Sequence, residues 1–166
     1  MVKTADLCDR FEEEAQVCVA DWRSYGGRSS LYGRVQTLRT FEDAALIRAT
    51  LCTDGAGRVL VVDAGGSGKA AVLGDNMARL GMQNGWRGVL IHGAIRDVDS
   101  LRELDFGVHA LGAVPVRGGK SGVGEVGVDI LVGGATIHPG DFVAMDGDGV
   151  VVCAAAHADD VLAWAT

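Results

Sequence analysis

Two predicted strands, residues 59–63 and 87–91, contain continuous apolar runs and constrain the fold more than any other feature of this chain. Between them, residues at helical spacing recur from Met77 to Asn84, and Gly85 follows, which predicts a helix that ends at a glycine. A strand, a helix and a second strand joined by short connections form a βαβ unit, whose crossover is nearly always right-handed. Because neither strand alternates with polar residues, we expect a sheet covered on both faces.

The rest of the chain adds elements on both sides of this unit. Helices are predicted from Thr4 to before Val17, from Phe41 to about Leu51, over 97–104 and over 156–164. Strands are predicted over 31–39 and 107–111. A flexible loop over 116–124 is expected next, followed by short strands over 126–132, 135–137, 141–145 and 149–153. The prediction is therefore an α/β fold in one domain, residues 1–166, with a β-rich C-terminal third.

Charge and hydropathy exclude several classes of function. The net charge is −7 and the pI is about 4.9, so a nucleic-acid backbone would be repelled. No apolar run approaches the ~20 residues that span a bilayer, and residues 1–6 lack a signal-peptide core, so we expect a cytoplasmic protein without membrane contact. The four cysteines are scattered, which predicts reduced thiols in the core rather than a metal site.

Arg96 and Asp97 follow the second apolar strand, which we expect to stop at Gly93. In open α/β sheets, ligands bind beyond the carboxyl ends of the strands. Arg96 offers a planar fork of donors for a carboxylate or phosphate, and Asp97 offers oxygen ligands for a hard divalent cation. A local ion pair, or Asp97 capping the helix that follows, explains the same residues. The residue types alone leave both interpretations open.

Three loops are expected to meet at this edge of the sheet: the glycine turn after Asp63, the helix start at Gly74 and the strand end at Arg96. The turn over 64–69 resembles a phosphate loop only superficially. Asp63 stands where the Walker motif needs glycine, and Ala70 stands where it needs Ser or Thr. Backbone amides near a bound anion stay an open interpretation of this turn.

Two further motif matches fail on context. Residues 122–127 match G-x-G-x-x-G, but a β-rich segment follows where a dinucleotide site needs a helix. Residues 146–149 read Asp-Gly-Asp-Gly, but the later acidic ligand of an EF-hand loop is missing, so a hairpin turn is predicted.

Taken together, these segments resemble the RraA-like family over essentially the whole chain. The segments that carry the resemblance are Gly26-Gly27-Arg28, Phe41-Glu42-Asp43, 59–63, Gly74-Asp75-Asn76-Met77, Asn84-Gly85-Trp86, Gly93-Ala94-Ile95-Arg96-Asp97, Gly133-Gly134-Ala135-Thr136, Pro139-Gly140-Asp141 and 146–149. The resemblance implies a compact layered sandwich similar to the swivelling β/β/α domain, with a central mixed sheet. It also implies a homotrimer or hexamer with sites between subunits.

The resemblance implies two functions from different classes. One is a class II 4-hydroxy-4-methyl-2-oxoglutarate aldolase, a metal-dependent lyase that also decarboxylates oxaloacetate. The other is a regulator that binds and inhibits ribonuclease E, where the negative charge of this chain would meet a basic segment. A third name used in the family, demethylmenaquinone methyltransferase, has no methyl-donor site here to support it. The carboxylate of Asp97 favours the enzyme.

Roles for the residues at the sheet edge follow from the same resemblance. Arg96 would contact a small 2-oxo acid, and Asp97 would ligate Mg²⁺ or Mn²⁺. The backbone amides that face the substrate carboxylate would come from Gly74, Asp75, Asn76 and Met77, and the Asp75 side chain would hold metal-bound water and relay a proton. Family members tend to have an acid four residues beyond the arginine, where this chain has Ser100, and a further acid is expected from a neighbouring subunit.

Overall fold

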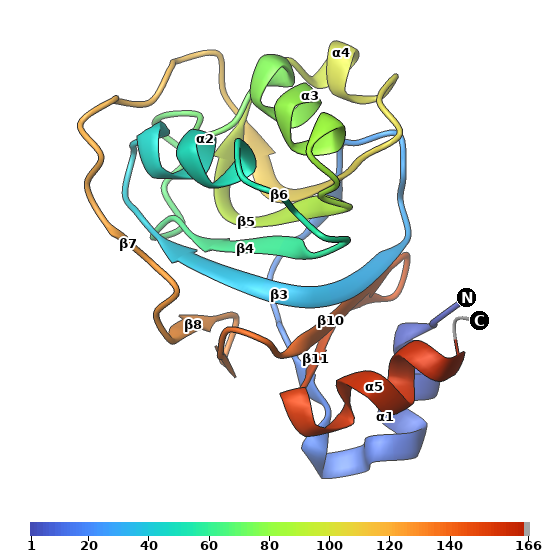
Figure 1. Cartoon of the computed structure of the whole chain (residues 1–166). Helices are drawn as coiled ribbons and strands as arrows, with labels where there is room; N and C mark the ends of the chain where they lie inside the picture. Colours follow the sequence, from blue (N-terminus) through green and yellow to red (C-terminus); the bar gives the residue numbers. More distant parts are fainter. Residues whose placement is uncertain (165–166) are drawn as a thin grey trace.

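The computed structural model describes residues 1–164, and a mixed β-sheet forms its centre (Figure 1). The strands of this sheet are β1 (Gln16–Val17), β2 (Arg23–Ser24), β3 (Leu31–Arg39), β4 (Val59–Asp63), β5 (Gly88–Ile95), β6 (Gly107–Ala113), β7 (Glu125–Val126), β10 (Phe142–Asp146) and β11 (Gly149–Cys153). Their spatial order is β1-β11-β10-β3-β4-β5-β6-β2, with β7 beside β3. β3 to β6 are parallel, whereas β10 and β11 pair antiparallel, so the mixed sheet is confirmed.

Helices and short strands cover the two faces of the parallel strands. α2 (Ala45–Leu51), α3 (Asp75–Gln83) and α4 (Val98–Leu101) lie on one face (Figure 1). The hairpin of β8 (Ile130–Val132) and β9 (Ala135–Ile137) packs with β10 and β11 on the other face. α1 (Thr4–Phe11) and α5 (Ala155–Trp164) pack against β10 and β11 and against each other, with the Phe11 and Trp164 rings 6.0 Å apart (Figure 1).

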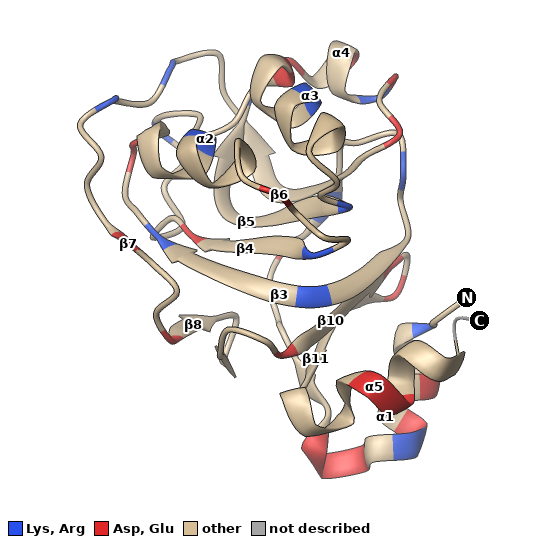
Figure 2. Ribbon diagram, in the orientation of Figure 1, with Lys and Arg blue, Asp and Glu red and all other residues tan. Residues whose placement is uncertain are grey.

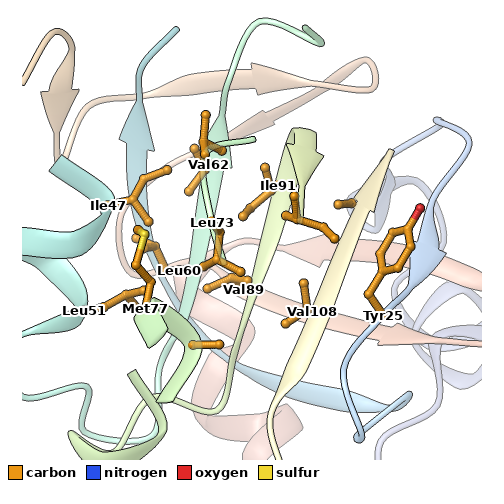
Figure 3. Packing of buried hydrophobic residues seen from close by; sticks show 14 of the residues in the cluster. Tyr25, Ile47, Leu51, Leu60, Val62, Leu73, Met77, Val89, Ile91 and Val108 are labelled. Carbon is orange, nitrogen blue, oxygen red and sulfur yellow. The ribbon is translucent and has the colours of Figure 1, made fainter. Parts of the chain in front are cut away.

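The βαβ unit of β4, α3 and β5 is the part of the core that positions the sheet edge. Leu60, Val62, Val89 and Ile91 point toward the helical layer, as Figure 3 shows. The alternate residues of β4 and β5, among them Leu90, belong to the core on the opposite face. Both faces of these strands are therefore buried, which explains why their sequences lack polar alternation.

The structure corrects two predicted ends near the sheet edge. β5 does not stop at Gly93 but continues to Ile95, with irregular pairing to β6 between Ile91 and Ala94. α2 begins at Ala45 rather than Phe41, because the buried Asp43 carboxylate accepts the Ala45 N–H at 3.0 Å and ends the preceding loop there.

Several other elements differ in length from the prediction. α1 ends at Phe11 and a 3₁₀ turn over Glu12–Glu14 follows, while α4 covers only part of 97–104. The expected strand over 126–132 is divided into β7 and β8, and the strand at 107–111 extends to Ala113.

Cys18 and Cys153 are buried thiols as predicted, but Cys52 is exposed, so the prediction of core thiols is wrong for Cys52.

The two motif matches have the structures that their context predicted. Asp146 pairs with Gly149 at the end of the β10–β11 hairpin, and residues 122–127 lead into β7 rather than a helix. None of the helices within residues 1–164 combines the length and hydropathy that a membrane span requires.

Candidate active site

A cavity of about 560 Å³ lies where α2, α3 and the loops after β5 and β6 meet. All six residues that the sequence places at the sheet edge line it: Gly74, Asp75, Asn76, Met77, Arg96 and Asp97. The glycine turn after β4 does not line this cavity, so the structure brings together two of the three predicted loops.

Asp97 connects the end of β5 to the first turn of α3. Its Oδ2 accepts the backbone N–H of Asp75 at 3.0 Å. A side chain at Gly74 would collide with this carboxylate, since a Cβ there would lie 2.6 Å from Oδ2. Asp97 itself has left-handed backbone, with φ 63°, a conformation that aspartate tolerates better than most residues.

This geometry differs from both local alternatives for Asp97. Its side chain makes no capping hydrogen bond to α4, the helix that follows it. Within residues 1–164, the ion pairs do not include one between Arg96 and Asp97. Asp97 instead caps α3, a helix that precedes it in the sequence, and only one of its oxygens is used in doing so.

Asp75 places a second carboxylate next to Asp97 at the cavity wall. Burial raises the pKa of Asp75, but its hydrogen bond with Arg79 and the Arg79 charge, with contributions from the neighbouring Asp97 and Asn76, hold it below its ordinary value. Arg79 Nη1 lies 2.9 Å from Asp75 Oδ2, one helical turn along α3. The expected acid at position 100 is absent, and Asp75 supplies the neighbouring carboxylate from another element.

The remaining predicted residues differ in what they present to the cavity. The half-buried Arg96 is held by its backbone N–H, which donates to the Leu73 carbonyl at 3.0 Å. Asn76 is exposed, and its side-chain oxygen accepts a hydrogen bond from Arg79 Nη1 at 3.4 Å. The Met77 side chain belongs to the apolar core under α3 (Figure 3), so Met77 offers the cavity its backbone.

Sequence reasoning missed three basic residues and one thiol of the cavity wall: Arg48, Arg117, Lys120 and Cys52. Arg48 and Cys52 lie at the C-terminal end of α2, and the two other bases lie in the loop over 114–124, which the sequence predicts only as flexible. No local spacing links these segments to the sheet edge, although Figure 2 shows basic residues on both.

Asp43 fastens this loop to the start of α2. Its carboxylate accepts the Ser121 N–H at 2.7 Å, the Ser121 hydroxyl at 2.8 Å and the Gly122 N–H at 3.1 Å, in addition to the Ala45 N–H. Burial raises the pKa of Asp43, but these hydrogen bonds outweigh it and keep the pKa below its ordinary value. The aspartate of the Phe41-Glu42-Asp43 segment is thus a structural anchor of the cavity.

In this cavity, one chain offers a cation two carboxylates, those of Asp75 and Asp97. Within residues 1–164, His, Cys, Asp and Glu form no cluster of three that could hold a metal ion. His92, the histidine closest in sequence to Arg96, does not line the cavity and packs edge-on against Trp22, with ring centroids 5.9 Å apart.

Comparison with known proteins supplies the family. The family profile described as Aldolase/RraA matches residues 4–152. The chain belongs to the RraA-like family. An RraA-like protein of Thermus thermophilus, named 4-hydroxy-4-methyl-2-oxoglutarate aldolase, is 47% identical over 150 residues, covering 90% of this chain and 91% of the relative.

Solved structures of RraA-like proteins share the fold and carry different functional names. The RNA-processing inhibitor RraA from Thermus thermophilus superposes with a TM-score of 0.89 at 45% identity, over 92% of this chain and 93% of its own. An S-adenosylmethionine: 2-dimethylmenaquinone methyltransferase from Geobacillus kaustophilus gives the same TM-score and identity, over 92% and 94%. These names cover lyase, regulator and methyltransferase, so the chemistry of the cavity has to decide among them.

Proposed function

We propose that this protein is a divalent-metal-dependent lyase that cleaves 4-hydroxy-4-methyl-2-oxoglutarate to pyruvate and also decarboxylates oxaloacetate. The observation that carries the proposal is the meeting of Arg96, Asp97 and the first turn of α3 in one cavity of substrate size. The aldolase name of the relative at 47% identity supports it.

Asp97 and Asp75 fit a hard divalent cation, because Mg²⁺ and Mn²⁺ prefer carboxylate oxygens. One Asp97 oxygen is free of the bond to the Asp75 amide, and the two carboxylates are neighbours. A third acid would come from a neighbouring subunit of a homotrimer or hexamer. When bound, the cation would polarise the 2-oxo group and offset the charge of the pyruvate enolate.

Arg96 and α3 would hold the oxo-acid end of the substrate. The guanidinium of Arg96 matches a carboxylate in shape and charge, and it stabilises the enolate oxygen as negative charge develops there. Of the first N–H groups of α3, that of Asp75 is used by Asp97, which leaves those of Asn76 and Met77 for the substrate carboxylate.

Asp75 would handle the proton of the aldol reaction. In the aldol substrate the C4 hydroxyl loses its proton, the C3–C4 bond breaks, and its electrons form the pyruvate enolate, which is then protonated at C3. The Asp75 carboxylate would orient the water that accepts the hydroxyl proton. Oxaloacetate loses CO₂ to give the same enolate and needs no such base, so its decarboxylation should tolerate the loss of Asp75 better.

The test compares two aspartates that are separated by one residue. Purified protein with Mg²⁺ or Mn²⁺ should release pyruvate from 4-hydroxy-4-methyl-2-oxoglutarate, and EDTA should abolish the release. Asp97→Ala should lower the rate at least about 100-fold, whereas Asp99→Ala, which changes an exposed residue outside the cavity, should not. Activity that survives EDTA, or equal losses in both variants, would contradict the proposal.

A second proposed role is inhibition of ribonuclease E. The solved structure named RNA-processing inhibitor RraA supports it, as does the acidic surface that α1, the turn over Glu12–Glu14 and α5 share (Figure 2). Such a surface would dock on a basic RNA-binding segment. A pull-down with ribonuclease E at low salt, paired with an RNA-cleavage assay, tests this role, and failure to bind would refute it.

A further inference from the structure

A second cavity, of about 300 Å³, lies where β6, the turn of the β10–β11 hairpin and residues 20–29 meet. Its volume reaches the lower end of the range for small-molecule sites. Among residues 1–164, no residue lines both this cavity and the candidate active site. The polar and aromatic side chains of its wall are those of Trp22, Ser24, Ser29, His109, Asp146 and Asp148.

His109, on β6, is a buried member of this wall that has no partner in the protein. Its side chain belongs to a residue only 4% exposed. Among the buried side-chain nitrogen and oxygen atoms of residues 1–164, His109 Nδ1 is the one without a hydrogen-bond partner. Burial lowers the pKa of His109 to about 4, so the ring is neutral at pH 7 and keeps one nitrogen as an acceptor. Because buried polar groups are nearly always hydrogen-bonded, the unpartnered ring indicates that a bound molecule supplies a donor.

The two carboxylates of the wall carry charge that no base of the described chain neutralises. Within residues 1–164, the ion pairs include neither Asp146 nor Asp148, and neither Lys nor Arg lines the cavity. Asp146 fixes the turn, because its Oδ2 accepts the Thr4 N–H at 2.8 Å and its Oδ1 accepts the Asp148 N–H at 2.9 Å. The cavity therefore has a rigid anionic rim, which attracts a cation.

The wall suits an organic cation better than a metal ion. Trp22 supplies an aromatic side chain, held in place by its Nε1–H, which donates to the Cys18 carbonyl at 2.9 Å. Aromatic rings attract ammonium groups, and more strongly where water is excluded. A metal ion lacks ligands here, because His, Cys, Asp and Glu within residues 1–164 form no cluster of three that could hold one. Both oxygens of Asp146 are also already engaged.

We propose that the second cavity binds a small organic amine as its ammonium ion. The ammonium N–H groups would donate to the Asp148 carboxylate and to the imidazole of His109, and the apolar chain of the amine would pack against Trp22. The inference does not depend on the proposed lyase function, since the two cavities have separate walls.

Two probes of similar size test the need for a charge. Butylamine, which is protonated at pH 7, and 1-butanol, which is neutral, are titrated separately and followed by saturation-transfer NMR. Butylammonium should bind with a Kd of about 1 mM, an affinity within reach of a ligand with so few atoms. 1-Butanol should bind at least about 10-fold more weakly, because it cannot form a charge-assisted hydrogen bond.

Two matched aspartate variants locate the binding. Asp148→Asn should raise the Kd for butylammonium about 10-fold, and its exposed position in a turn should let the variant fold normally. Asp99→Asn removes the same charge from an exposed residue outside both cavities and should leave the Kd unchanged. His109→Leu, which replaces the ring by an apolar side chain, should also weaken binding.

Three results would overturn the amine site. One is equal affinity for butylammonium and 1-butanol, and another is an equal effect of the two aspartate variants. The third is the lack of saturation transfer to butylammonium at about 20 mM, well above the expected Kd.

Discussion

Gly74→Ala tests how closely the function depends on the position of Asp97. The backbone of Gly74 is extended, with φ −132°, so alanine is conformationally acceptable there. Its Cβ would lie 2.6 Å from Asp97 Oδ2, whereas ordinary contact begins at 3.4 Å, so the carboxylate must move by about 0.8 Å. A misplacement of about 1 Å at a reacting centre can lower a rate about 100-fold.

The same substitution should hardly affect folding. The displaced atom is the end of a flexible side chain, and the fold loses at most the cap on the Asp75 N–H, about 1 kcal/mol of unfolding free energy. We therefore expect an approximately 100-fold drop in pyruvate release from oxaloacetate with a small change in Tm. Gly68→Ala is the matched control, because a Cβ there meets nothing within 4 Å. A Gly74→Ala protein as active as this control would refute the role of Asp97.

Three further predictions concern the fold and the cavity wall. Asp43→Asn should lower the free energy of unfolding by about 2–4 kcal/mol at pH 7, measured by urea titration. The folded state lowers the pKa of Asp43, so the ionised carboxylate stabilises the fold fully only above its pKa in the unfolded chain. The difference in unfolding free energy between wild type and Asp43→Asn should therefore shrink as pH falls below about 4. A difference that stays constant with pH would contradict this role of the carboxylate. Cys52 should react with a thiol reagent in the native protein, and oxaloacetate should protect it. Cys18 should not react, because burial raises its pKa to about 12. Labelling of Cys52 that oxaloacetate does not slow would contradict its place in the cavity wall. Gly26→Ala would place a Cβ in the backbone just before β6 and should prevent stable folding, so a normal melting curve would contradict this packing.

The βαβ unit was predictable because its signals are local. The apolar runs of β4 and β5 and the glycine after α3 each act within a few residues. The end of β5 was not predictable in the same way. The sequence predicts that the strand stops at Gly93, but Gly93 lies inside β5, where a Cβ would come within 2.8 Å of the Ala64 Cβ. It is a glycine of close approach rather than of a turn, and only the packed structure distinguishes the two.

The candidate site likewise contains residues that local sequence signals predict and residues whose positions depend on contacts distant in sequence. Arg96 and Asp97 were found because strand ends in α/β sheets collect ligands. Arg117 and Lys120 were missed because their positions depend on hydrogen bonds to Asp43, 78 and 79 residues away in sequence from the donors. Contacts over such separations leave no periodic pattern in the sequence, so the loop is expected to be flexible when it is in fact fastened.

Stabilisation of the pyruvate enolate in this cavity is measured directly by hydrogen exchange at the methyl group of pyruvate. In D₂O with the protein and Mg²⁺, pyruvate should exchange its methyl protons for deuterium, and NMR follows the loss of the methyl proton signal. Exchange should stop with EDTA and fall at least about 100-fold in Arg96→Met, but persist in Arg102→Met, which changes an exposed base outside the cavity. Exchange no faster than with Mg²⁺ alone, or equal in the two variants, would show that the cavity does not stabilise the enolate.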